Sequence, residues 1–180
     1  MSDLEARIAA LEESAPRRET EKSDSVSIVC FSGEWDRLFA VFTIANGALA
    51  LGQEVHLFFT FWATAALRDA EKTSANKPLM NRLLGKFLPC GAGRAPLSRM
   101  NWGGLGKLFL GYRMRKHGIG DLDELIEKAR EMGAHFHLCD TSAALLGLDC
   151  DELIGDGCVD PCGVATFLGK AMKGRMVLFV

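Results

Sequence analysis

The sequence predicts an α/β fold, in which an open and mostly parallel sheet carries helices on both of its faces. Two observations support this prediction. Short runs rich in Val, Ile and Phe alternate along the chain with longer segments whose apolar residues recur at helical spacing. The short runs are also apolar almost throughout, as expected of parallel strands that are buried on both faces. With 180 residues, the chain is long enough for one domain with a sizeable core, which we place at residues 25–180.

The first half of this domain predicts a strand–helix–strand unit. Residues 25–31 (SVSIVCF) and 54–61 (EVHLFFTF) have the composition of strands, and residues 33–52 between them predict a helix that ends at Gly52. The first connection, FSGEWD, lacks the G-x-G-x-x-G pattern of dinucleotide-binding folds. The sequence therefore does not support a dinucleotide site.

The second half continues the alternation. The expected elements are a helix, a strand, two helices and a closing strand, at residues 121–133, 134–139, 141–148, 161–174 and 175–180. Asp121 is a suitable cap for the first of these helices, and Gly133 a suitable stop. Thr141 or Ser142 could cap the next helix, and Pro161 suits the first turn of the last one.

Two segments fall outside this pattern. Residues 1–24 contain a short amphipathic helix, expected at residues 2–13, and a polar linker. Residues 72–120 form a partly helical insertion that has no Asp or Glu. Its basic residues are Lys72, Lys77, Arg82, Lys86, Arg94, Arg99, Lys107, Arg113, Arg115 and Lys116. This insertion is either a solvated basic face, an electropositive wall beside an active site, or a dock for an acidic partner.

Charge and hydropathy exclude several classes of function. The net charge of −2 gives no bias towards nucleic acid. The N-terminal residues are too charged for a signal peptide, and the longest apolar run is shorter than the ~18 residues that a membrane span needs. The helix LGKLFLGYRMRKH concentrates its charge at one end, which does not favour a membrane-surface role. We expect a soluble, cytoplasmic protein.

Cys139 is the main candidate for chemistry. It follows a predicted strand and precedes a predicted helix, where unpaired N–H groups favour a thiolate. Alternation along the strand places His135, His137 and Cys139 on one face. Three interpretations remain open: a buried structural cysteine, a metal site built by these three residues, and a nucleophile that handles sulfur. We favour the nucleophile and expect no metal, because no fourth ligand is evident.

Other cysteines could supply further thiols. Cys158 and Cys162 are spaced C-x-x-x-C, which could close a disulfide, and Cys162 would lie at a helix N-terminus. Cys90 lies in a basic loop near Arg94, from which it could deliver sulfur to Cys139 or resolve its oxidised form. The two remaining cysteines, Cys30 and Cys150, are expected to be structural.

Several segments of the chain resemble the DsrE/DsrF/DsrH-like family of sulfurtransferases, in particular its longer DsrE-like members with a basic insertion. These segments are HLFFTFWAT, the insertion with LSRMNWGG at its centre, LDELIEKAREMGAHFHLCDTSAALLGLDCDELIGD, and GVATFLGKA. The chain departs from the longer members in two places. Ala143 and Ala144 stand where those members tend to have Met-rich and acidic residues, and CVDPC stands where they have small or apolar ones.

The resemblance implies a flavodoxin-like fold, assembly into oligomers, and a persulfide carried on Cys139. It also implies exchange of sulfur with small carrier proteins of the TusA type or with rhodaneses, without a metal or organic cofactor. We expect the thiolate or persulfide anion to be stabilised by Thr141 and Ser142 at the helix start and by Arg94 and Arg99.

Two alternatives belong to other functional classes. The protein could be a non-catalytic assembly subunit on the same fold, with binding by the N-terminal helix and the insertion. It could also be a thiol or metal sensor that uses Cys158, Cys162 and the histidines.

Overall fold

The structure is a computed structural model that describes residues 23–69, 71–72, 88–155, 157 and 159–180. Its centre is a sheet of five strands in the order β4-β3-β2-β1-β5, and every neighbouring pair is parallel. The strands are β1 Ser23–Cys30, β2 Glu54–Phe59, β3 His135–Cys139, β4 Val159–Cys162 and β5 Gly174–Phe179. All five carboxyl ends therefore lie at the same edge of the sheet, and the predicted parallel α/β fold is confirmed.

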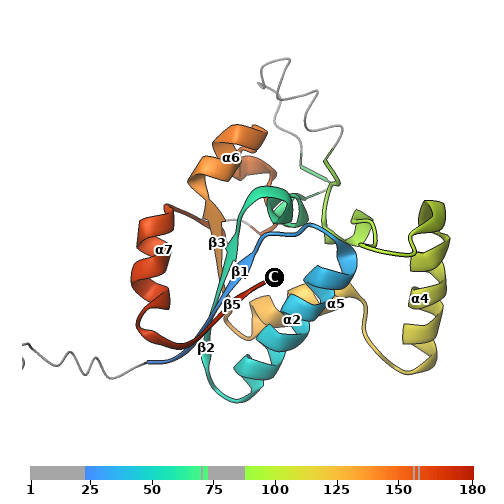
Figure 1. The fold of residues 1–180 in the computed structure, drawn as a ribbon, viewed down its shortest axis with the longest axis horizontal. Helices are drawn as coiled ribbons and strands as arrows, with labels where there is room; N and C mark the ends of the chain where they lie inside the picture. The colour runs from blue at the N-terminus through green and yellow to red at the C-terminus, as the bar shows by residue number, and fades with distance from the viewer. Residues whose placement is uncertain (1–22, 70, 73–87, 156, 158) are drawn as a thin grey trace, which may run out of the picture.

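Helices cover both faces of this sheet. The α-helices are α2 Trp35–Ala50, α4 Leu105–Lys116, α5 Leu122–Glu131, α6 Asp140–Leu146 and α7 Val164–Ala171. Short 3-10 helices are formed by Phe61–Leu67, Ala92–Arg94, Trp102–Gly104 and Cys150–Glu152. Figure 1 shows α2 and α5 on one side of the sheet, α7 on the other, and α6 at the carboxyl edge. This arrangement of helices is flavodoxin-like, as the resemblance to the DsrE/DsrF/DsrH-like family implies.

The two faces of the sheet differ in chemistry. The face under α2 and α5 is apolar, and its Phe59 and Phe136 stack on each other and against Phe42 of α2. Burying each of these rings contributes roughly 1.5–3 kcal/mol to folding. The face under α7 instead buries Ser27 and His137, both at most 1% exposed. Alternation along each strand thus separates an apolar core from a partly polar layer.

Local signals fix α5 as expected. The Asp121 carboxylate accepts a hydrogen bond of 3.0 Å from the Glu124 N–H, so the predicted cap is confirmed. Gly133 has φ +88°, a left-handed conformation that ends the helix at little steric cost.

Two predicted helix starts are wrong. Pro161 and Cys162 belong to β4, and the last helix begins only at Val164. Pro161 is tolerated there because β4 is an edge strand, in which one side needs no partner for its N–H. The helix after β3 begins at Asp140 and is preceded by Cys139, so neither Thr141 nor Ser142 is its cap. The Ser142 hydroxyl makes tertiary contacts instead.

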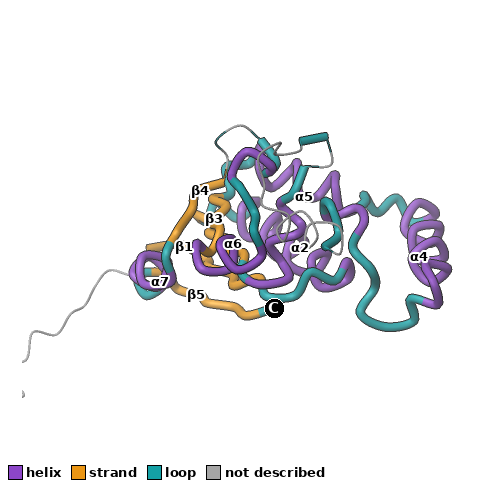
Figure 2. The backbone as a smooth tube through the Cα atoms, turned by 90° about the horizontal axis from the view of Figure 1, so that it is seen from above, coloured by secondary structure: helices purple, strands orange, loops and turns teal. Residues whose placement is uncertain are grey.

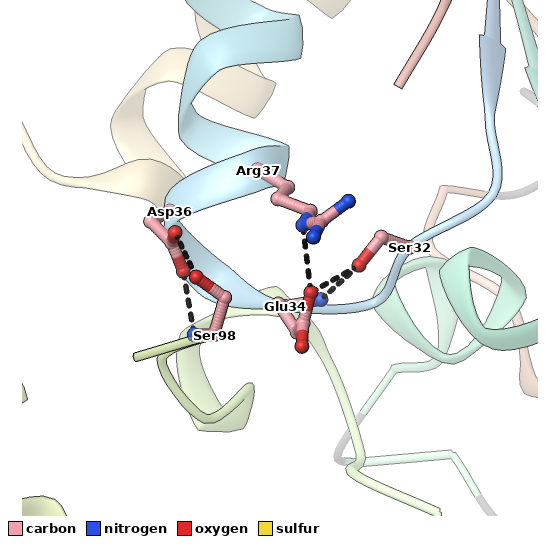
Figure 3. A network of polar contacts seen from close by, with 5 residues as sticks. All are labelled: Ser32, Glu34, Asp36, Arg37 and Ser98. Atoms are coloured by element: carbon pink, nitrogen blue, oxygen red, sulfur yellow. Dashed lines mark hydrogen bonds and ion pairs between the residues drawn. The ribbon is translucent and has the colours of Figure 1, made fainter. Parts of the chain in front are cut away.

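The connection FSGEWD anchors the insertion to α2 (Figure 3). The Asp36 carboxylate accepts hydrogen bonds from the Ser98 N–H at 2.8 Å and the Ser98 hydroxyl at 2.5 Å. Burial raises the pKa of Asp36, but the two Ser98 bonds, the backbone N–H of Asp36 and the charge of Arg37 together hold it below its usual value. Gly33 approaches the Trp62 carbonyl so closely that a Cβ would overlap it. Gly33 is therefore needed for the close approach of this loop to the backbone of Trp62.

Beyond its attachment at Ser98, the insertion extends away from the sheet. Helix α4 stands apart from the other helices in both views (Figures 1 and 2). Its outer apolar side chains are more than half exposed; they are Leu105, Leu108, Phe109 and Tyr112. Within the described ranges, none of the helices combines the length and hydropathy needed to cross a membrane. The expected N-terminal helix, the linker before Ser23, Cys158 and residues 73–87 of the insertion lie outside the described residues.

Candidate active site around Cys139

Cys139 lies at the carboxyl edge of the sheet, where all five strands end. It is the last residue of β3 and directly precedes α6. Its side chain is only 3% exposed and packs in a small cluster on the α7 face, together with Phe58, Phe167, Ala171 and Cys162. The parallel register places Cys139 directly opposite Cys162, the last residue of β4. Two thiols therefore share the α7 face at this end of the sheet, whereas Cys30 at the end of β1 packs in the core on the other face.

Hydroxyl and amide groups from two strand ends surround the Cys139 sulfur. The hydroxyls of Ser142 and Thr60 and the N–H groups of Thr141 and Ser142 face this sulfur, and each lowers the pKa of the Cys139 thiol. The Ser142 hydroxyl also accepts the Phe61 N–H at 3.0 Å and lies 2.9 Å from the Thr60 hydroxyl. The Ser142 hydroxyl therefore ties the loop after β2 to the first turn of α6.

The loop that carries Thr60 is held in an unusual conformation. Phe61 has φ +46°, in the left-handed region that residues other than glycine rarely adopt. Two groups fix it: its N–H bonds to Ser142, and its carbonyl accepts the Thr64 hydroxyl at 2.6 Å. Backbone strain of this kind persists where the surrounding structure over-determines it, commonly at functional sites.

The electrostatics of the site favour a thiolate at Cys139. Burial by itself raises the pKa of this thiol, because it disfavours the charged form. The hydrogen bonds from Ser142, Thr60 and Thr141 outweigh burial and lower the pKa below its ordinary value. A thiolate is the nucleophilic form of cysteine, so Cys139 is activated by neutral donors.

The pKa of Cys162 is shifted in the opposite direction, above its ordinary value. Burial raises its pKa, Lys170 lowers it, and the carboxylates of Asp140 and Asp160 raise it further, so the net pKa lies above the ordinary value. Its thiol donates to the Gly163 carbonyl at 3.4 Å. The pair thus combines a thiolate-prone cysteine with one that keeps its proton.

Four polar residues gather at the other end of β2 and β3. The Glu54 carboxylate lies 3.3 Å from Nε2 of His56 and 3.4 Å from Nε2 of His135. Within the described residues, these three form a group whose ligand atoms all lie within 4.8 Å and could hold a metal ion. His137 instead lies 3.2 Å from Nδ1 of His56. Cys139 is not a member of this group, and lies about 13 Å along β3 from His135.

The remaining predicted site residues lie elsewhere. Cys90 donates to the Asp69 carbonyl at 3.5 Å and lines a cavity of about 390 Å³ together with Arg94. Arg99 borders a different, apolar hollow beside α4. Cys139 lines neither of these two cavities. The structure thus gathers Cys139, Thr141, Ser142 and Cys162, and it leaves Cys90, Arg94 and Arg99 outside that group.

Sequence reasoning missed Thr60. It follows β2 directly, as Thr141 and Ser142 follow β3, and β2 and β3 are neighbours in the sheet. The carboxyl ends of adjacent parallel strands lie at one edge of the sheet. A hydroxyl residue directly after β2 could therefore have been predicted to lie near Cys139.

Comparisons with known proteins point to one family. A family model described as DsrE/DsrF/DrsH-like matches residues 22–179. Uncharacterized protein YrkE of Bacillus subtilis is 40% identical over 161 residues, which cover 89% of this chain and 99% of YrkE. Sulfur carrier protein DsrE2 of Allochromatium vinosum is 27% identical over 160 residues, which cover 86% of this chain and 97% of DsrE2. With nearly the whole described chain matched, this protein belongs to the DsrE/DsrF/DrsH-like family.

Proposed function

We propose that this protein takes part in sulfur transfer and carries sulfane sulfur as a persulfide on Cys139. Family membership and the similarity to a protein named as a sulfur carrier support a role in sulfur transfer. The observation that carries the proposal is the set of hydroxyl and amide donors around Cys139, which lowers its pKa. Such donors favour a sulfur anion whether it is a thiolate or a persulfide.

The exchange needs only the residues described at the site. The Cys139 thiolate attacks the outer sulfur of a donor persulfide, a new S–S bond forms on Cys139, and the donor cysteine leaves as a thiolate. Ser142, Thr60 and the Thr141 N–H stabilise the Cys139 thiolate before this step. Its charge leaves with the donor thiolate, and an anion returns to Cys139 when the new persulfide loses its proton. Handing the sulfur to an acceptor thiolate is the reverse reaction.

The partner in this proposal is a small sulfur-carrier protein of the TusA type or a rhodanese. Helix α4 offers it a mixed surface, since Arg113, Arg115 and Lys116 are exposed beside the outer apolar side chains of the same helix. An acidic partner surface complements this charge. Self-assembly belongs to the same proposal and is supported by Met176, Val177 and Phe179 of edge strand β5, all about half exposed or more.

Intact mass spectrometry after incubation with polysulfide tests the proposal. We expect increments of whole sulfur atoms that a reductant removes, and we expect Cys139→Ser to keep its fold and lose them. Cys150→Ser is the matched control, because Cys150 is an exposed cysteine outside the Cys139 cluster. Loading that survives in Cys139→Ser and disappears in Cys90→Ser would move the sulfur-carrying site to the insertion.

The same variant separates the two alternative classes. A non-catalytic assembly subunit would bind its partners equally well with serine at position 139. A sensor based on Cys158, Cys162 and the histidines would respond to oxidant or metal without loading sulfur on Cys139.

A further inference from the structure

Cys139 and Cys162 are placed as a reactive pair. They are register partners at the ends of adjacent parallel strands, and alternation puts both side chains on the α7 face. Adjacent strands lie about 4.8 Å apart. Cysteines joined by a disulfide usually have Cα atoms about 4.4–6.8 Å apart, so the backbone of β3 and β4 already meets this requirement.

We propose that Cys162 resolves the Cys139 persulfide, so that the protein can release its sulfur as sulfide and end as a Cys139–Cys162 disulfide. This inference rests on the proposed function, because it needs a persulfide on Cys139. It adds a second activity, reductive release of sulfide, to the transfer of sulfane sulfur between proteins.

The step balances in atoms and electrons. The Cys162 sulfur attacks the inner sulfur of the persulfide, the bond between Cys139 and its outer sulfur breaks, and a bond between the two cysteine sulfurs forms. The Cys162 proton leaves with the outer sulfur as HS⁻. The outer sulfur gains two electrons, and the two cysteine sulfurs together lose them. A dithiol reductant then returns the disulfide to two thiols.

The surroundings of the pair favour an internal reaction over attack by a free thiol. Phe167 of α7 is fully buried over the cluster and stacks on Phe58, with ring centroids 4.5 Å apart. Neither cysteine is more than 6% exposed. An external thiol must displace this cover, whereas Cys162 already lies beneath it.

Burial and two carboxylates disfavour the thiolate of Cys162, the form that attacks the persulfide. The groups that face it are Asp140 of α6, Asp160 of β4 and Lys170 of α7, and together with burial they leave its pKa raised. Release should therefore accelerate as the pH rises and the Cys162 thiolate forms.

The test uses the full chain, loaded with polysulfide and freed of excess reagent. We expect it to release sulfide over time, faster at higher pH, while peptide mapping finds a growing Cys139–Cys162 disulfide. Cys162→Ala should hold its sulfur and release sulfide at least tenfold more slowly, and Cys162→Ser should do the same if alanine disturbs the fold. Cys150→Ala is the control that should release sulfide as the parent does.

Three outcomes would overturn the inference. They are sulfide release from Cys162→Ala and Cys162→Ser at the parent rate, a disulfide that maps to Cys158–Cys162 or to Cys90, and loaded parent protein that forms no disulfide. Failure of the parent chain to load sulfur at all would instead contradict the proposed function, so the two failures are distinguishable.

Discussion

At the scale of single residues, the Ser142 side chain is the group that lowers the pKa of Cys139 most. Its hydroxyl accepts the Phe61 N–H and lowers the pKa of the Cys139 thiol, so one oxygen links the loop after β2 to the surroundings of that thiol. Arg94 and Arg99 are exposed and are not among the groups that shift the pKa of Cys139. The groups that lower the pKa of Cys139 are therefore neutral, and stabilisation of its anion by Arg94 or Arg99 stays a prediction.

Removing that hydroxyl should raise the pKa of Cys139. A hydrogen bond to a charged group contributes about 1.5–3 kcal/mol, and one pKa unit corresponds to about 1.36 kcal/mol. We therefore expect Ser142→Ala to shift the pH profile of Cys139 alkylation upward by about one to two units. Thr141→Ala should shift it little, because Thr141 contributes its N–H and not its side chain. An unchanged profile in Ser142→Ala would show that the Ser142 hydroxyl does not activate the thiol.

At the scale of elements, the sheet face under α7 is the sensitive layer. Strands β1, β2 and β3 bury Ser27, His56 and His137 there, and within the described residues His137 Nδ1 and the Ser27 hydroxyl have no hydrogen-bond partner. Burial lowers the pKa of His137 to about 4, and the nearby Lys170 and His56 lower it in the same direction. This layer is folded with an uncharged imidazole in its interior.

Acid should therefore weaken the fold through His137. Its pKa is depressed on folding, from about 6.5 in the unfolded chain. Stability linked to this residue is then fully present above pH ~6.5 and is lost as the pH falls towards 4. The loss reaches about 3 kcal/mol at most. Urea unfolding between pH 7 and 4 measures it, and His137→Gln should flatten the slope.

His117→Gln is the matched control for this experiment, because His117 is an exposed residue at the end of α4. It should keep the parent slope. Carboxylates also titrate in this range, so the informative quantity is the difference between each variant and the parent. A His137→Gln slope equal to that of the parent would contradict the assignment.

At the scale of the whole molecule, the proposed function assigns sulfur loading and partner docking to different parts of the chain. Cys139 is buried at the carboxyl edge of the sheet, whereas the exposed charge of Arg113, Arg115 and Lys116 lies on α4, which stands apart from that edge. Exposed charges act over about 8 Å at physiological salt, so added salt should affect docking and not loading.

Delivery to a partner protein should therefore depend on salt and on the charge of α4. We expect Arg113→Glu with Arg115→Glu to slow transfer to an acidic sulfur carrier at least tenfold, chiefly through association, as high salt does. Loading by a small neutral donor should not change. Lys173→Glu, which alters an exposed lysine on a different part of the chain, should transfer normally. Transfer indifferent to salt and to both reversals would exclude α4 as the docking surface.

The sequence by itself determined the elements whose signals are local. Apolar runs and helical spacing located β1, β2, β3, α2 and α5, and the cap at Asp121 was visible because it acts within one helical turn. The position of Cys139 between a strand and a helix was also a local feature. These signals suffice because each depends on residues only a few positions apart.

Tertiary structure alone decided what surrounds Cys139. Thr60 and Ser142 meet across 82 positions of sequence, and Cys162 becomes a partner only because β4 pairs with β3 at the sheet edge. The same edge position lets Pro161 lie in a strand, where its sequence context favoured a helix start. Strand order and register depend on packing between distant segments, and no local period records them.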